Sequence, residues 1–307
     1  MSDEKSIEVV HLDIFKFFSI LWKNKILIIL VTSLISIFSV YFSLSLPNYY
    51  SSSALLVQKD SGSSNSASLG QYSNIASIAG INLDSGQENK IDFAIATLKS
   101  RYFIELIANS IDDFAPILIA SKRYDDINKL IIFDEDIYNS KTKEWVREVE
   151  PPFSPKPSLL ELHRVFNSEV MSVNVDKQTG FITISIELIS SYHAKNFLDQ
   201  VINNLNEISR KNALLEADRS LGFLESELSK VSTLSIKDSL SNLVDIELKK
   251  KMMAEVNKDY LLKVIDPPFV PERKSRPSRS IICIIGFIFG LLLSISIVFI
   301  KEIFYRN

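Results

Sequence analysis

Two long runs of apolar residues lie near the two ends of the chain. Residues 26–46 read ILIILVTSLISIFSVYFSLSL and residues 281–300 read IICIIGFIFGLLLSISIVFI, without a charged residue in either. Because an α-helix rises about 1.5 Å per residue, each run can cross a hydrocarbon core of about 30 Å. A cleaved signal peptide, with Ser43 and Ser45 at the cleavage site, is the rival interpretation of the first run. The run exceeds the roughly 7–15 apolar residues of a signal peptide, so the sequence predicts two retained transmembrane helices.

Between these runs the pattern changes repeatedly between the period of a strand and that of a helix. Strands are predicted at residues 53–58, 171–175, 181–188 and 260–265. Asp176 to Gly180 joins the second and third strands as a hairpin turn, with glycine where a positive φ is needed. Residues 92–119 carry apolar side chains at helical spacing, which predicts one helix that ends before Pro116.

The strongest periodicity starts at Ser190 and predicts a helix of about forty residues, or roughly 60 Å. Its apolar positions are Ala194, Phe197, Leu198, Val201, Ile202, Leu205 and Ile208, then Leu214, Ala217, Leu221, Leu224, Leu228 and Val231. The heptad part spans under three repeats, so a coiled coil stays open. After a break at residues 232–235, Ser235 and Asp238 stand in capping-box spacing and predict a return helix to about Lys258.

Each predicted transmembrane helix carries small residues on one face. Gly286, Gly290 and Ser294 recur at four-residue spacing in the second. In the first, Ser36, Ser39 and Ser43 form a similar stripe. Small residues let helix backbones approach closely in lipid, so these faces predict helix–helix packing. The alternative is that glycine and serine are simply common in membrane helices.

A proline-rich basic segment, here called the collar (residues 267–279), leads directly into the second apolar run. Its prolines are Pro267, Pro268, Pro271 and Pro277, and its basic residues are Arg273, Lys274, Arg276 and Arg279. Proline lacks an N–H and biases the residue before it away from helix, so an extended path is expected. Basic side chains there can contact anionic lipid headgroups, each contributing about 1 kcal/mol. A plain solvated linker is the alternative.

The charges beside the two apolar runs disagree about orientation. Lys16, Lys23 and Lys25 precede the first run and only Lys59 follows it within twenty residues, which places the N-terminus in the cytoplasm. The basic collar before the second run favours the opposite orientation. Because the first helix usually dominates and long translocated segments largely escape the charge rule, we expect both termini inside and residues 47–280 outside.

Composition excludes several classes of function. A net charge of −3 and a pI near 5.8 argue against nucleic acid as a partner. Cys283 is the only cysteine, so no intramolecular disulfide can form, and the three histidines have no companions at ligand spacing. We therefore expect no metal and no cofactor. Residues 59–90 are rich in Ser, Gly, Asn and Gln around the apolar stretch IASIAGINL (75–83), which predicts a long loop with one buried or partner-facing patch.

Taken in order, five segments resemble the Wzz-type polysaccharide chain-length determinants, the bacterial polysaccharide co-polymerases. These are HLDIFKFFSILWKNK, NYYSSSALLVQ, EWVREVEPPFSPKPSLLELHRVF, DKQTGFITISIELISSYHAKNFLDQVINNLNEISR and, most specifically, YLLKVIDPPFVPERKSRPSRSIICIIGFIFG. The resemblance spans nearly the whole chain and includes no catalytic motif. It implies a periplasmic middle segment, a membrane-proximal α/β base, a long helical arm and assembly into a homo-oligomeric ring.

Together these observations predict an α+β fold in which two transmembrane helices bracket a periplasmic domain with a mixed α/β base and a long extended helical arm. The predicted segments are a cytoplasmic leader (1–25), the first transmembrane helix (26–46), the base with its loop insertion (47–190), the arm and return helix (191–259), the closing strand and collar (260–280), the second transmembrane helix (281–300) and a cytoplasmic tail (301–307). Leu214, Leu221, Leu224 and Leu228 are the candidate oligomer contacts on the arm.

The function expected from the resemblance is non-enzymatic regulation of the chain length of a lipid-linked surface polysaccharide, such as lipopolysaccharide O-antigen, through a Wzy-type polymerase. Membrane lipids and the lipid-linked polysaccharide are further candidate partners. An enzyme is the first alternative, but the chain lacks phosphate-loop, nucleophile-elbow and metal motifs. A periplasmic sensor would need an output domain beyond the short predicted tails. Export of capsule or exopolysaccharide remains an alternative within the family, and the short tail favours its kinase-free class.

Overall fold

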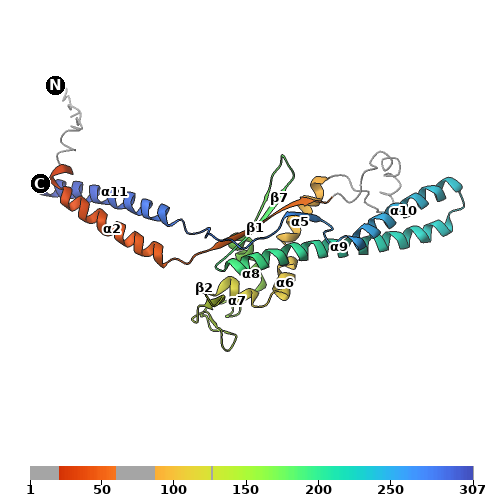
Figure 1. Cartoon of the computed structure of the whole chain (residues 1–307), viewed down its shortest axis with the longest axis horizontal. Coiled ribbons are helices and arrows are strands. Elements are labelled where there is room, and N and C mark those ends of the chain that lie inside the picture. Colours follow the sequence, from red (N-terminus) through yellow and green to blue (C-terminus); the bar gives the residue numbers. More distant parts are fainter. Residues whose placement is uncertain (1–20, 60–86, 126, 307) are drawn as a thin grey trace, which may run out of the picture. The chain divides into compact units, whose positions relative to one another are not determined.

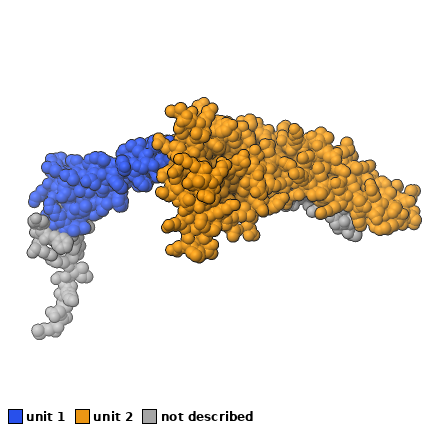
Figure 2. All heavy atoms as spheres, turned by 90° about the horizontal axis from the view of Figure 1, so that it is seen from below, with its two compact units in different colours: residues 1–48, 276–307 blue, residues 49–275 orange. Residues whose placement is uncertain are grey.

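The chain forms two compact units, which are described separately. The computed structural model describes residues 21–59, 87–125 and 127–306. One unit is Met1–Asn48 with Arg276–Asn307, and the other is Tyr49–Ser275 (Figure 2). Most of the predicted loop insertion, including the apolar stretch at 75–83, lies outside the described residues, as does most of the predicted leader.

The first unit is a pair of apolar helices. Helix α2 spans Lys25–Ser45 and helix α11 spans Arg279–Arg306. Both are long and apolar enough to cross a membrane. Most of their large apolar side chains, such as Ile26 and Leu34 in α2, are exposed, which suits a surface that faces lipid rather than water.

The second unit is built on a four-stranded antiparallel sheet. Its strands are β1 (Tyr50–Gln58), β6 (Met171–Val175), β7 (Ile182–Leu188) and β8 (Leu262–Asp266), in the order β6-β7-β1-β8. The predicted hairpin between β6 and β7 is confirmed, and Gly180 has the expected positive φ of 72°. Alternate residues of β7 are buried, so one face of the sheet is covered.

Helix α9 (Ser191–Lys230) covers that face with its first half (Figure 1). The seven apolar residues predicted on this half, from Ala194 to Ile208, are all buried in the core against the sheet. Phe114 and Phe166 join Phe197 of α9 in this core, and the Phe114 ring lies 5.7 Å from each of the other two ring centroids. Burial of this helix face against the sheet is the main apolar contact of the base.

Residues 92–119 do not form the single helix that their spacing predicts. They lie in α5 (Gln87–Leu98), α6 (Arg101–Ser110) and α7 (Phe114–Ile119). The break before α6 arises because the Ser100 hydroxyl accepts a hydrogen bond from the Phe103 N–H at 3.1 Å and caps a new helix. Asp113, with a φ of 54°, turns the chain before α7. Pro116 fits inside α7 because N–H groups of a first helical turn need no intrahelical partner.

A small lobe between α7 and β6, here called the side lobe (residues 121–157), contains elements that the sequence did not predict. Two short hairpins pair β2 (Ser121–Asp125) with β3 (Leu130–Phe133), and β4 (Tyr138–Asn139) with β5 (Glu144–Trp145). Helix α8 (Leu159–Val165) follows and continues into the π-helical turn η1 (Phe166–Val170).

The second half of α9 extends past the sheet and packs along α10 (Leu234–Val256) (Figure 1). The predicted capping box at Ser235 and Asp238 is wrong. Helix α10 begins at Leu234 with Thr233 at the N-cap, and the Thr233 side chain makes no capping hydrogen bond. These elements confirm the predicted α+β fold class: a base, a long helical arm and two bracketing apolar helices.

One buried amide joins the arm to the sheet. Asn206 of α9 is 3% exposed, and its Oδ1 accepts hydrogen bonds from the Leu261 and Leu262 N–H groups at 3.0 and 2.9 Å. Its Nδ2 donates to the Leu262 carbonyl at 2.9 Å. The side chain therefore pairs with the backbone at the start of the edge strand β8 as a neighbouring strand would. This contact fixes the position at which the chain returns from the arm to the sheet.

Replacing Asn206 by Ala should release the start of β8. The change leaves two buried N–H groups and one carbonyl without their partner, which should cost about 1–3 kcal/mol of local stability. Hydrogen exchange of the full chain should show faster exchange at Leu261 and Leu262. Asn203→Ala, at an exposed position of the same helix, is the matched control and should leave β8 unchanged. Equal protection in both variants would contradict this role of Asn206.

Candidate functional site

Three parts of the chain combine defined geometry with polar chemistry: the pair of apolar helices, the collar and arm, and the side lobe. The helix pair meets at Gly286, Gly290 and Ser294 of α11, which face Thr32, Ile35 and Ser39 of α2, whereas the sequence predicts Ser36, Ser39 and Ser43 on α2. A Cβ atom added at Gly286 would lie 2.5 Å from Ser39 Cβ, closer than such atoms approach. At Gly290 an added Cβ would lie 3.1 Å from Ile35 Cβ and 3.5 Å from Thr32 Cα. Glycine is therefore what allows α11 to lie this close to α2.

Polar side chains cross the same interface. The Ser39 hydroxyl donates to the Ile282 carbonyl at 3.1 Å, and Thr32 Oγ1 donates to Ser294 Oγ at 3.3 Å. Ser36 instead donates to the Thr32 carbonyl of its own helix. Ser43 is buried, and its Oγ has no hydrogen-bond partner among the described residues. In lipid these hydrogen bonds contribute directional contacts that apolar side chains alone do not supply.

The collar is an extended segment that is tied in part to the start of β1. The Ser275 N–H donates to the Tyr49 carbonyl at 2.8 Å, and the Ser52 hydroxyl donates to the Phe269 carbonyl at 2.7 Å. Pro271 is buried, whereas Pro267, Arg273 and Arg276 are exposed and Pro268, Lys274 and Pro277 are half-buried. Within the helix unit, Arg279 Nη2 donates to Asn48 Oδ1 at 3.1 Å. The segment is therefore more than a solvated linker along part of its length.

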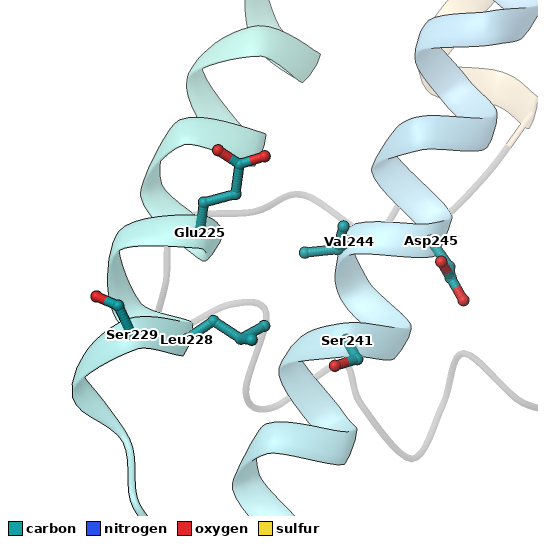
Figure 3. Close-up of a pocket in the computed structure, with 6 residues that line it drawn as sticks. All are labelled: Glu225, Leu228, Ser229, Ser241, Val244 and Asp245. Atoms are coloured by element: carbon teal, nitrogen blue, oxygen red, sulfur yellow. The ribbon is translucent and has the colours of Figure 1, made fainter.

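The arm has a small apolar core of its own. Leu224 of α9 packs with Leu240 and Leu243 of α10, and Lys251 Nζ lies 2.8 Å from the Asp218 carboxylate. Of the four arm leucines proposed from sequence, Leu221 and Leu224 are buried whereas Leu214 and Leu228 are half-buried. Leu228 and Val244 line a shallow cavity between the two helices, with Glu225, Ser229, Ser241 and Asp245 around it (Figure 3).

The side lobe is organised around an ion pair that the sequence did not signal. Arg147 donates through Nη1 and Nη2 to the two Glu161 carboxylate oxygens at 2.5 and 2.7 Å. Its Nε and Nη2 also donate to the Pro155 and Ser154 carbonyls at 2.7 and 3.3 Å. One guanidinium thus joins the strand end at 145–147, the loop at 154–155 and the first turn of α8.

This ion pair shifts the pKa of both Glu161 and Arg147. The hydrogen bonds from Arg147 hold the pKa of Glu161 below its usual range. Burial is the second-largest effect and acts in the opposite direction, but it is outweighed. The pKa of Arg147 is raised, chiefly by the same hydrogen bonds. Nearby, burial and then the Asp113 charge raise the pKa of Tyr138. Glu161 is accordingly ionised and paired at neutral pH.

Residues 10–110 match the family model of the chain length determinant protein, Wzz. The predicted resemblance to the Wzz-type co-polymerases is confirmed. No curated protein matches the sequence.

Two solved structures show a weaker likeness to this chain. A full-length bacterial polysaccharide co-polymerase is 12% identical over 94% of this chain and 97% of its own, with a TM-score of 0.40. A fragment of WzzB, a polysaccharide co-polymerase from Salmonella Typhimurium, is 11% identical over 75% of this chain and 100% of its own, with a TM-score of 0.28. The match of residues 10–110 to the family model, not these two scores, carries the resemblance.

A disulfide between the two apolar helices offers a direct test of the glycine contact. In a Cys283→Ser background, cysteines replacing Thr32 and Ser294 should form an intramolecular disulfide, because the native hydroxyl oxygens lie 3.3 Å apart. Adding Gly286→Leu should lower the yield several-fold, since the new side chain overlaps Ser39. Ser296→Leu, a small-to-large change at an exposed position of α11, should leave the yield unchanged. An unaltered yield with Gly286→Leu would contradict close packing here.

The Arg147–Glu161 pair predicts acid sensitivity of the side lobe. Because the folded-state pKa of Glu161 lies below its ordinary value of 4.5, its contribution to stability is full above that value and is lost as pH falls through the folded pKa. In a Trp22→Phe background, Trp145 fluorescence should shift to the red in this acid range. Glu161→Gln should show the shift already at neutral pH, whereas Glu148→Gln, at an exposed neighbouring position, should not. An identical acid profile for all three chains would contradict the assignment.

Proposed function

We propose that this chain is a non-enzymatic inner-membrane scaffold that sets the chain length of a lipid-linked surface polysaccharide, lipopolysaccharide O-antigen being the first candidate. The observation that carries the proposal is the match of residues 10–110 to the chain length determinant family. The two apolar helices of membrane-spanning length and the large unit between them support it. In this proposal both termini are cytoplasmic, and residues 47–280 lie in the periplasm.

The scaffold acts by assembling as a homo-oligomeric ring and by holding or limiting a Wzy-type polymerase. The arm supports this idea because large apolar side chains of α9 and α10, such as Leu215, Phe223 and Met252, are exposed. Exposed apolar side chains along a helical hairpin suit contact with another protein surface. Leu214, Leu221, Leu224 and Leu228 then serve mainly to hold α9 against α10, and their neighbours form the outer contact.

The collar and the helix pair have separate roles in the same proposal. Arg273, Lys274, Arg276 and Arg279 lie close to the start of α11 and supply positive charge for anionic headgroups. The collar prolines restrict the path between the two units. Gly286, Gly290 and their partners on α2 hold the two spans together, so each subunit presents one fixed pair of helices to its neighbours.

Deleting the gene tests the proposal at the level of the polymer. Gel profiles of surface lipopolysaccharide should lose their modal clustering in the deletion strain and regain it with the wild-type gene. A chain with Gly286→Leu and Gly290→Leu should restore it poorly, because the helix pair cannot close, whereas the Ser296→Leu chain should restore it fully. Membrane levels of each variant, measured by immunoblot, control for loss of the protein.

Three results would change the proposal in distinct ways. Unchanged lipopolysaccharide with altered capsule or secreted polymer would assign the chain to capsule or exopolysaccharide export instead. No change in any surface polymer would refute a role in chain length. Full restoration by the double glycine variant would leave the function standing and refute the importance of the helix pair.

A further inference from the structure

The side lobe contains a cavity that the proposed scaffold role does not use. It lies between residues 143–146 and 154–156, has a volume of about 500 Å³ and opens to solvent. Its lining includes Trp145, Ser154 and three charged side chains, Lys143, Glu144 and Lys156. The cavity is shallow, so a ligand bound there would keep one side in solvent.

Trp145 is held rigidly at this cavity. It pairs with Tyr138 across the β4–β5 hairpin, and the two ring centroids lie 5.0 Å apart. Tyr138 is itself buried and packs edge-on against Phe133 at 5.5 Å. The guanidinium carbon of Arg147 lies 5.8 Å from the Trp145 ring centroid. Trp145 is nevertheless only half-buried, and it is one of the residues that line the cavity.

The two walls of the cavity are joined without any ligand. The walls are residues 143–146 and residues 154–156. Arg147 comes directly after the first wall and donates hydrogen bonds to the Ser154 and Pro155 carbonyls of the second. Glu161 fixes the guanidinium from behind through two further hydrogen bonds. Within the second wall, the Ser154 hydroxyl donates to the Lys156 carbonyl at 2.6 Å. A cavity whose walls are held together in this way loses little conformational entropy when it binds a ligand.

We propose that this cavity is a carbohydrate subsite that binds one saccharide unit of the polymer, with the sugar ring lying against Trp145. The inference rests on the proposed function for the identity of the polymer, but the site itself is argued from its lining. One face of a sugar ring presents C–H groups, which pack on an aromatic face, while its edge presents hydroxyls. An open indole bordered by polar side chains matches both requirements.

The mixed charges of the lining favour hydroxyls over other ligands. Lysine side chains donate hydrogen bonds and a glutamate accepts them, so Lys143, Lys156 and Glu144 together suit groups that both donate and accept. A phosphate would meet Glu144 beside the two lysines, so the lining is not the purely cationic surface that is typical of a phosphate or nucleic-acid site. The core of a protein interface is depleted in Lys, Glu and Ser, which are the residue types found here. The cavity between α9 and α10 has no aromatic lining residue, so it lacks the surface for stacking.

Fluorescence of the full chain in detergent tests the subsite directly. Trp22→Phe leaves Trp145 as the single tryptophan, because the chain has two. The probes are polysaccharide released by mild acid from lipopolysaccharide of the source strain, capsular polysaccharide of that strain, and dextran as an unrelated polymer. Saturable change of Trp145 emission with one of the first two, and none with dextran, is the expected result.

Calorimetric titration of variants tests whether the cavity is the site. Trp145→Leu should weaken binding at least about tenfold, whereas Trp145→Tyr should stay within a few-fold of the original because it keeps an aromatic face. Lys156→Ala should weaken binding several-fold and leave Trp145 emission unchanged, since this side chain is exposed and the change cannot disturb the fold of the lobe. Lys141→Ala, at an exposed position outside the cavity, should bind as the original does.

The outcomes separate this inference from the proposed function. Restored modal length in the complemented strain, with no saturable binding of either surface polysaccharide, overturns the subsite and leaves chain-length control standing. Binding that survives both Trp145→Leu and Lys156→Ala also overturns it, because the sugar then binds elsewhere. Loss of cross-linking to a protein partner in Trp145→Leu, with sugar binding intact, would make the cavity a protein contact instead. The fourth outcome combines saturable binding by the purified chain with unchanged surface polymers in the deletion strain. It would support the subsite and refute the proposed function.

Discussion

The antiparallel pairing of β1 with β8 is the interaction on which the rest of the second unit depends. These strands come from the two ends of the unit, and Val57 pairs with Lys263 across more than two hundred residues of chain. The hydrogen bonds from the Ser275 N–H to the Tyr49 carbonyl, just before β1, and from the Ser52 hydroxyl of β1 to the Phe269 carbonyl continue the same closure. Everything between them can therefore extend far from the sheet and still return to a defined place. Asn206 adds a second tie at that place, because it links the arm helix to the first residues of β8.

Much of this architecture could be predicted from periodicity. Long, regular patterns mark the two apolar runs, the β6–β7 hairpin and the buried face of α9. Such patterns predict structure well because the hydrophobic effect is non-directional and scales with the apolar area removed from water. The failures lie where one polar or backbone feature overrides the pattern. Ser100 starts a new helix inside an apolar stretch that reads as continuous, and Thr233 rather than Ser235 precedes α10.

The side lobe could not be predicted for a related reason. Its strands β4 and β5 are two residues each, too short to show any period. They are held by individual side-chain contacts across short loops, chiefly Tyr138 with Trp145 and Arg147 with Glu161. The sequence EWVREVEPPFSPKP shows an aromatic residue, charges and prolines, but nothing in their spacing tells which carboxylate Arg147 selects. Only the folded chain shows that Glu161, in the next helix, is its partner.

Apolar burial and polar contacts therefore have different roles along this chain. Burial forms the elements, but it discriminates weakly between neighbouring registers, and in lipid it gives almost no preference for one helix partner over another. Each register here is set by a small number of directional contacts. Ser39 against Gly286 aligns the two apolar helices, Asn206 aligns the arm with the sheet, and Arg147 aligns the walls of the side lobe. In the scaffold role proposed above, these alignments are what the chain presents to a partner. A substitution that removes one of them should leave the elements intact and change how they are presented.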